Sequence, residues 1–125
     1  MNDPARRECG LDVYRQVYGD DAIVLEPGQS DFFDGMLEQL FAEVWSRPAL
    51  DIAARRLLVI GVLAAQGRFD PLGVQFDRVL AAGELTEAQV REIVVHLTQY
   101  VGYPTASELY RVAETAIAKS HKASS

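Results

Sequence analysis

Apolar side chains recur every three or four residues along most of this chain, the spacing that places them on one face of an α-helix. No stretch alternates between apolar and polar residues for long, as a half-buried strand would. The pattern predicts an all-α fold of about six helices joined by short turns. The predicted helices run from Asp3 to about Tyr18, Ser30 to Pro48, Asp51 to Gln66, Asp70 to Gly83, Thr86 to Gly102, and Thr105 or Ser107 to about Lys119.

Capping residues mark several of these boundaries. Asp3 and Pro4 form an N-cap and first-turn pair, and Thr86 with Gln89 forms a capping box. Ser30 and Asp51 are the expected caps of the second and third helices. The tail SHKASS is expected to fray.

Hydrophobic patterning also predicts what each helix buries. The second helix carries an amphipathic stripe of seven residues: Phe32, Phe33, Met36, Leu37, Leu40, Phe41 and Val44. The third is apolar on every face from Leu57 to Ala65, which predicts a central buried helix. The longest irregular segment, residues 19–29, contains a short apolar piece at residues 22–25 that we do not expect to form a strand.

Length and charge narrow the class of protein. A chain of 125 residues suits one domain, expected here over residues 1–125. The net charge of −6 argues against nucleic-acid and anionic-membrane partners. The longest apolar run is too short to span a bilayer, and the first ten residues do not resemble a signal peptide. We therefore expect a cytoplasmic protein.

The residues that usually hold metals and cofactors are sparse. Cys9 is the only cysteine, so neither an internal disulfide nor a CxxC redox pair is possible. His96 and His121 lie 25 residues apart without further ligand spacing, and no glycine-rich phosphate loop is present. We expect neither a metal nor an organic cofactor.

The segment EVWSRPALD, residues 43–51, joins two predicted helices around one tryptophan. Trp45 is either a core plug at a proline corner or the wall of a pocket. In the second case Glu43, on the same last turn, lies beside apolar surface, where burial raises a carboxylate's pKa and suits it to proton transfer. Arg55, one turn past Asp51, is positioned to pair with Glu43 or with a substrate carboxylate.

The fifth predicted helix carries Glu92, His96 and Tyr100 at spacings of four residues, along one stripe. His96 lies at the border of the polar and apolar faces, where a histidine is either a structural residue or a proton-transfer group. Tyr100 and Tyr103 flank a glycine and either donate hydrogen bonds to a ligand or pack.

These motifs occur in an order that resembles the carboxymuconolactone decarboxylase family. The match is carried by the opening segment RRECGLDVYRQVYGD, then EVWSRPALD, LAAQGR, LTEAQVREI and YVGYP, and covers essentially the whole chain. The resemblance implies an all-helical fold, a homo-oligomer (trimer or hexamer) and a small-molecule substrate decarboxylated without a cofactor. It also implies catalytic or substrate-binding roles for Glu43, Trp45, Arg55 and His96. The family's peroxidase branch uses a CxxC pair, so peroxidase activity is not expected.

The chain departs from the decarboxylase pattern at several polar positions. Gln75 and Ala22 each stand where the family usually has a histidine. Ile52 and Ala53 replace arginines. Val101 replaces a frequent cysteine. A pocket that has lost imidazoles and guanidiniums is less suited to a doubly anionic acid, because each desolvated charge needs a partner.

Three hypotheses follow. The first is a divergent enzyme that transfers protons in an apolar pocket, acting on a small, weakly charged metabolite by decarboxylation, isomerisation or cyclisation. It assigns Glu43 and His96 as the acid–base pair, and assigns substrate contacts to Trp45, Arg55, Gln75, Tyr100 and Tyr103. The second is 4-carboxymuconolactone decarboxylase activity in aromatic catabolism. The third is a non-catalytic binding or scaffold protein of the same fold.

Overall fold

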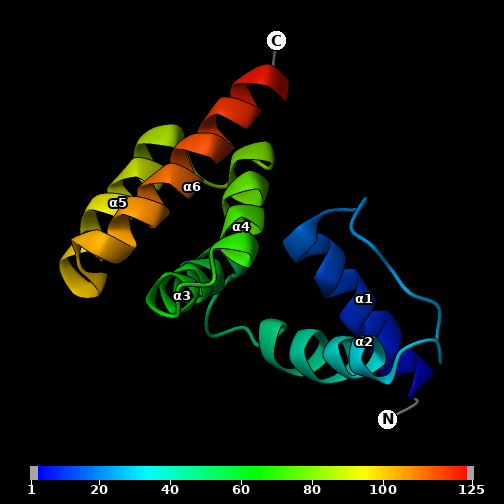
Figure 1. The fold of residues 1–125 in the computed structure, drawn as a ribbon. Helices are drawn as coiled ribbons and strands as arrows, with labels where there is room; N and C mark the ends of the chain where they lie inside the picture. Colours follow the sequence, from blue (N-terminus) through cyan, green and yellow to red (C-terminus); the bar gives the residue numbers. More distant parts are fainter. Residues whose placement is uncertain (1–2, 124–125) are drawn as a thin grey trace. The chain divides into compact units, whose positions relative to one another are not determined.

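The computed structural model describes residues 3–123, which form six α-helices and one π-helix and contain no strand, so the predicted all-α fold is confirmed (Figure 1). The chain divides into two compact units, the first ending at Arg55 and the second beginning at Arg56. The helices are α1 (Pro4–Tyr18), α2 (Asp31–Gly35), η1 (Met36–Trp45), α3 (Ile52–Ala65), α4 (Phe69–Ala81), α5 (Glu87–Val101) and α6 (Tyr103–Ala123). None of these described helices is both long and apolar enough to cross a membrane.

The first unit packs α1 along η1. Both predicted caps are confirmed: the Asp3 side chain accepts a hydrogen bond from the Arg6 amide at 3.2 Å, and Ser30 Oγ accepts one from Phe33 at 3.1 Å. The helices approach closely at Gly10, where an added Cβ would lie 1.8 Å from the Leu37 carbonyl oxygen. Only glycine permits this backbone contact.

An aromatic cluster forms the interior of the first unit. Tyr14 is at its centre, with ring centroids 5.7 Å from Phe33, 5.4 Å from Phe41 and 5.5 Å from Tyr18. The Tyr14 hydroxyl donates to the Ile23 carbonyl oxygen at 2.7 Å, which fastens the irregular segment after α1. As expected, that segment forms no strand.

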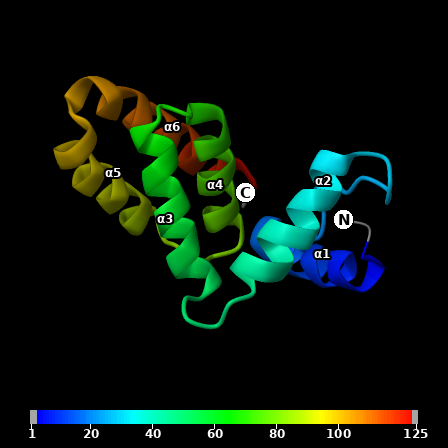
Figure 2. The same ribbon diagram turned by 90° about the horizontal axis from the view of Figure 1, so that it is seen from below.

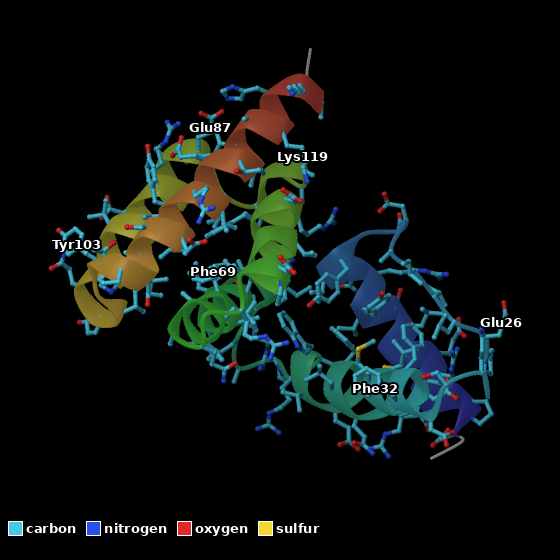
Figure 3. All side chains as sticks on the ribbon, in the orientation of Figure 1. Glu26, Phe32, Phe69, Glu87, Tyr103 and Lys119 are labelled. Carbon is cyan, nitrogen blue, oxygen red and sulfur yellow. The ribbon has the colours of Figure 1, made fainter. Side chains whose placement is uncertain are left out.

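The prediction of one α-helix from Ser30 is wrong after Gly35, because η1 has the wider π-helical turn. The buried apolar residues are Phe33, Leu37, Phe41 and Trp45, spaced by four residues, and Asp34 and Glu38 are buried beside them. The predicted seven-residue stripe is therefore only partly buried. Phe32 is 84% exposed (Figure 3), and Leu40 and Val44 are also exposed.

The second unit is a helical bundle in which α6 packs along both α4 and α5 (Figure 2). Its core is aliphatic except for Phe76, and consists of Ile60, Ala64, Leu72, Phe76, Val79, Val90, Val94, Leu109, Ala113, Ala116 and Ile117. Gly67, Gly83 and Gly102 end the preceding helices with positive φ angles of 67°, 68° and 88°.

The prediction that residues 57–65 form a central buried helix is wrong. The buried residues of α3 are Arg56, Ile60 and Ala64, a single stripe at spacing four. Leu58 is 60% exposed and Val62 53% exposed. A continuous apolar run in the sequence does not reveal which face of a helix meets the core. In α3 only one face does.

Two helix starts also differ from the predictions. Helix α4 begins at Phe69, one residue before Asp70, and α6 begins at Tyr103 rather than after Thr105 or Ser107. The Ser107 hydroxyl instead donates within the helix to the Tyr103 carbonyl oxygen at 3.0 Å. The tail was expected to fray from residue 120, but α6 continues to Ala123. Residues 124 and 125 lie outside the described part of the chain.

Candidate functional site

A groove of about 420 Å³ in the second unit brings several candidate residues together. We call it the His96 groove. It is lined by Leu57 of α3, by Leu85, which precedes α5, and by residues of α5: Gln89, Glu92, Ile93, His96 and Leu97. Most of its exposed lining is apolar, and neither lysine nor arginine is among these described residues. Such a surface suits a small, mainly apolar ligand with few charges.

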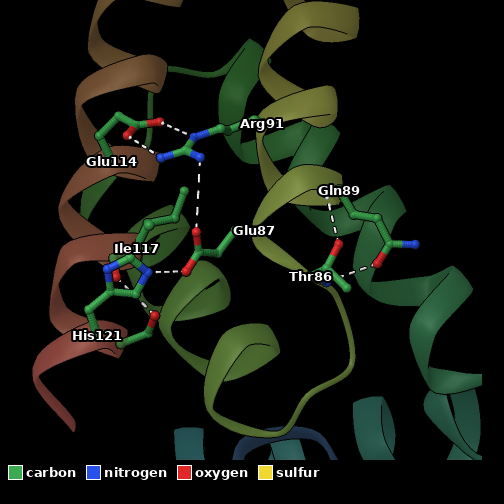
Figure 4. Close-up of polar contacts among 8 residues, drawn as sticks. Thr86, Glu87, Gln89, Arg91, Glu114, Ile117 and His121 are labelled. Atoms are coloured by element: carbon green, nitrogen blue, oxygen red, sulfur yellow. Dashed lines mark hydrogen bonds and ion pairs between the residues drawn. The ribbon is translucent and has the colours of Figure 1, made fainter. Parts of the chain in front are cut away.

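The start of α5 sets which side chains enter the groove. Thr86 Oγ1 accepts a hydrogen bond from the Gln89 amide at 3.1 Å, and Gln89 Oε1 accepts one from the Thr86 amide at 2.9 Å (Figure 4). Counting from Gln89, the other lining residues of α5 follow at i+3, i+4, i+7 and i+8, which is one helical face. The predicted capping box thus fixes the register of the site.

His96 is exposed at the groove and is the only histidine in its lining. Its ring centroid lies 5.3 Å from that of Tyr100, one turn further along α5, with 38° between the ring planes. Glu92 lies one turn earlier and lines the same groove. The predicted stripe of Glu92, His96 and Tyr100 is therefore present on one exposed side of α5.

Tyr100 and Tyr103 are themselves highly exposed, at 78% and 73%. Tyr103 projects from the start of α6 (Figure 3). Neither tyrosine lines the His96 groove. Their predicted role in substrate binding stays a prediction.

Gln75 belongs to a buried polar cluster that sequence analysis missed. The side chain of Arg56 is 1% exposed, and its guanidinium donates from Nε and NH2 to the two carboxylate oxygens of Glu84, at 2.8 and 3.2 Å. Its NH1 donates to Gln75 Oε1 at 3.0 Å. The only sequence signal is an arginine pair at the start of an apolar helix, which does not show that the second arginine faces inward.

The remaining predicted site residues lie in the first unit. Glu43 is exposed and forms an ion pair with Arg6, not with Arg55. Arg55 is half-buried, and donates to the carbonyl oxygens of Arg47 and Leu50 at 2.9 and 3.1 Å, thereby holding the corner before α3. Trp45 is 8% exposed and stacks on Phe41 with ring centroids 5.9 Å apart, so it packs in the core of this unit.

Glu43 and His96 thus belong to different units. Their assignment as an acid–base pair stays a prediction. The second unit by itself contains the His96 groove, which holds an imidazole and a carboxylate with neither lysine nor arginine among its described lining residues. Another groove of this unit contains His121 and Glu87, but Lys119 lines it as well. The geometry therefore supports the His96 groove as the site.

A larger groove of about 520 Å³ lies between α4 and α6. Its polar lining consists mainly of charged side chains: Asp70, Asp77, Glu108, Arg111 and Lys119. Lys119 Nζ donates to Asp77 at 2.9 Å, so part of this charge is already paired. Neither histidine nor cysteine is among the described residues that line this groove, and charged surface open to water is poorly suited to proton transfer. No group of three or more His, Cys, Asp or Glu within residues 3–123 is arranged to hold a metal ion.

Ion pairs on another face of α5 fasten it to α6 (Figure 4). The Arg91 guanidinium donates from Nε and NH2 to the two Glu114 oxygens, each at 3.0 Å. This contact lowers the pKa of Glu114 and raises that of Arg91. His121 of α6 pairs with Glu87 nearby. His121 is therefore placed in a surface ion-pair network, away from the lining of the His96 groove.

Comparison with known proteins agrees with the helical architecture. The model of the carboxymuconolactone decarboxylase family matches residues 30–115. The chain is 32% identical to 4-carboxymuconolactone decarboxylase of Acinetobacter baylyi over 91% of this chain and 88% of that protein. It is 33% identical to nitrosuccinic acid decarboxylase of Metarhizium robertsii over 73% of this chain and 60% of that protein. No solved structure gave a significant match.

Proposed function

Because the chain belongs to the carboxymuconolactone decarboxylase family, we propose that it is an enzyme that removes CO2 from a small, weakly charged organic acid in the His96 groove. The observation that carries this proposal is the groove itself, a mostly apolar surface that contains one imidazole and one carboxylate. The two relatives with assigned activities are both decarboxylases. Apolar walls favour decarboxylation, since they disfavour a charged carboxylate relative to neutral CO2.

His96 is the proposed proton donor. Loss of CO2 breaks the bond between the carboxylate carbon and its neighbour, and leaves the electron pair on the neighbouring carbon. The protonated imidazole donates a proton to that carbon, becomes neutral, and regains a proton from solvent. Glu92, one turn away on the same face, also lines the groove. These steps need no oxidant or reductant.

The groove also favours a second candidate function. Isomerisation or cyclisation of an uncharged metabolite needs the same proton transfer and no clamp for a carboxylate. The absence of lysine and arginine from the described lining residues supports it. The two candidates differ in one product, since only decarboxylation releases CO2.

The test is a comparison of four compounds: 4-carboxymuconolactone, nitrosuccinic acid, and the mono-ester of each in which the carboxylate that is not lost as CO2 is esterified, so that one charge is removed. We expect CO2 release to be faster from the mono-esters. Faster CO2 release from the diacids would contradict the proposal that the substrate is weakly charged. A product of unchanged mass would favour isomerisation. Ligand-dependent thermal stabilisation without any turnover would favour a non-catalytic binding protein.

A further inference from the structure

The buried cluster of Arg56, Glu84 and Gln75 links three segments of the second unit. Arg56 is on α3, Gln75 on α4, and Glu84 in the turn before α5. The guanidinium uses three nitrogens for these partners, at 2.8, 3.2 and 3.0 Å. A guanidinium is planar and its donors are fixed in direction, so three such bonds determine the orientation of the partners closely.

The turn that carries Glu84 is also held through its backbone. The amides of Glu84 and Leu85 donate to the Val79 carbonyl oxygen, at 2.9 and 3.3 Å, and Gly83 has a φ of 68°. The turn is therefore fastened to α4 by its main chain and to α3 by the Glu84 side chain. A segment held at both points has little freedom to move.

The residues that follow the two charged residues are walls of the His96 groove. Leu57 follows Arg56, and Leu85 follows Glu84. In a helix, consecutive side chains point about 100° apart, so the inward direction of Arg56 sets the outward direction of Leu57. Similarly, the direction of the Glu84 side chain restricts where Leu85 can lie.

We infer that Arg56, Glu84 and Gln75 are positioning residues that hold the leucine walls of the His96 groove in place. The importance of these residues for catalysis rests on the proposed function. Their positioning of the leucine walls concerns the groove alone. A buried ion pair adds little stability compared with apolar residues of similar volume, so its value here is the fixed geometry that it imposes. Gln75 then acts through Arg56 and not by polarising the substrate.

The test compares Glu84→Gln with Glu114→Gln. Both changes remove the charge from a carboxylate that binds an arginine through both oxygens, but Glu114 joins α5 to α6 and neither it nor Arg91 lines the groove. The first readout is the NMR methyl signals of the leucines in the free protein. We expect Glu84→Gln to shift the signals of Leu57 and Leu85, and Glu114→Gln to leave them unchanged.

The second readout is the binding of phenylpropionate, an apolar monocarboxylate, followed by the imidazole signals of His96. We expect Glu84→Gln to weaken binding at least about fivefold, and Glu114→Gln to leave it unchanged. Gln75→Met, which keeps the side-chain volume and removes the acceptor for Arg56, repeats both measurements if Glu84→Gln does not fold.

The two readouts separate the inference from the proposed function. Leucine signals that stay unchanged in a folded variant, or that shift equally in Glu114→Gln, overturn the positioning role. Shifted leucines in a protein whose His96 signals do not respond to phenylpropionate support the positioning role and count against the proposed function.

Discussion

His96 lies on the face of α5 that lines the groove. Gln89, Glu92 and His96 share one face of α5, and the capping box at Thr86 fixes where that face begins. The burial of Arg56 has no comparable signal. Its main partner, Glu84, is 28 residues away, and only the packing of α3 against the turn between α4 and α5 brings the two together.

Glu43 is the predicted catalytic residue with the least structural support, because it is exposed and paired with Arg6. If it takes part in proton transfer, Glu43→Gln will reduce turnover by at least about a hundredfold. Arg6→Gln removes its ion-pair partner and leaves the carboxylate, so it serves as the matched control. Equal rates for both variants and the wild type would show that Glu43 takes no part in the reaction.

Asp34 gives a pH-dependent contribution to stability in the first unit. Its carboxylate accepts hydrogen bonds from Arg7 Nε at 2.8 Å and from the Gly28 amide at 2.9 Å, and these contacts, the Arg7 bond foremost, lower its pKa. A lowered folded pKa stabilises the fold above the unfolded value of about 3.9, and that contribution is lost as pH falls through the folded pKa.

We therefore expect Asp34→Asn to lower the free energy of unfolding at neutral pH, with the difference from wild type shrinking in acid. Denaturant unfolding of both proteins, from about pH 7 down to about pH 2, measures this difference. Asp12→Asn, at an exposed position, is the control, and its difference from wild type should stay small at every pH. A difference for Asp34→Asn that grows in acid would show that the assigned contacts are wrong.

At the scale of helices, caps and glycines are local signals and are predicted well. The Asp3, Ser30, Asp51 and Thr86 caps are all present: the Asp51 side chain, for example, accepts from the Ala54 amide at 2.8 Å. The π-helical turn of η1 was not predicted. Inward residues spaced by four are compatible with either helix, so the pattern alone does not distinguish them.

The contact between α1 and η1 depends on Gly10. Gly10→Ala places a methyl group 1.8 Å from the Leu37 carbonyl oxygen, so the two backbones must separate. We expect this change to lower the free energy of unfolding by about 3 kcal/mol, at the upper end of the usual range for overpacked sites. Chemical denaturation measures it.

Gly61→Ala on α3 is the matched control. An added Cβ there meets no atom within 4 Å, and alanine is more favourable than glycine inside a helix by about 1 kcal/mol. This variant should be as stable as the wild type or more stable. If Gly10→Ala also kept or raised the free energy of unfolding, this would contradict the close approach of α1 and η1.

At the scale of the whole molecule, the family and the helical class follow from the order of several motifs, none of which is sufficient alone. The exposed face of α3 could not be predicted, because an apolar run does not identify what covers it. Leu58 and Val62 remain more than half exposed in the single chain, and exposed aliphatic patches of this kind often mark protein–protein contacts.

We expect the protein to form a trimer or hexamer, as the sequence resemblance implies, with this face of α3 in the contact. Light scattering after size exclusion should give three or six chain masses. Leu58→Glu should reduce the measured mass, and Gln99→Glu, which adds the same charge at an exposed polar position, should not. A wild-type protein that is monomeric at high concentration would refute the expectation.

The most direct test of the account compares His96→Gln with His121→Gln. The substrate is whichever of the four acids and mono-esters the wild type decarboxylates fastest. Both histidines are exposed, but His121 lies in the α5–α6 ion-pair network and does not line the groove. We predict that His96→Gln lowers the rate of CO2 release at least about a hundredfold, and that His121→Gln keeps the wild-type rate. Wild-type rates from both variants would contradict the assignment of the His96 groove as the site of the reaction.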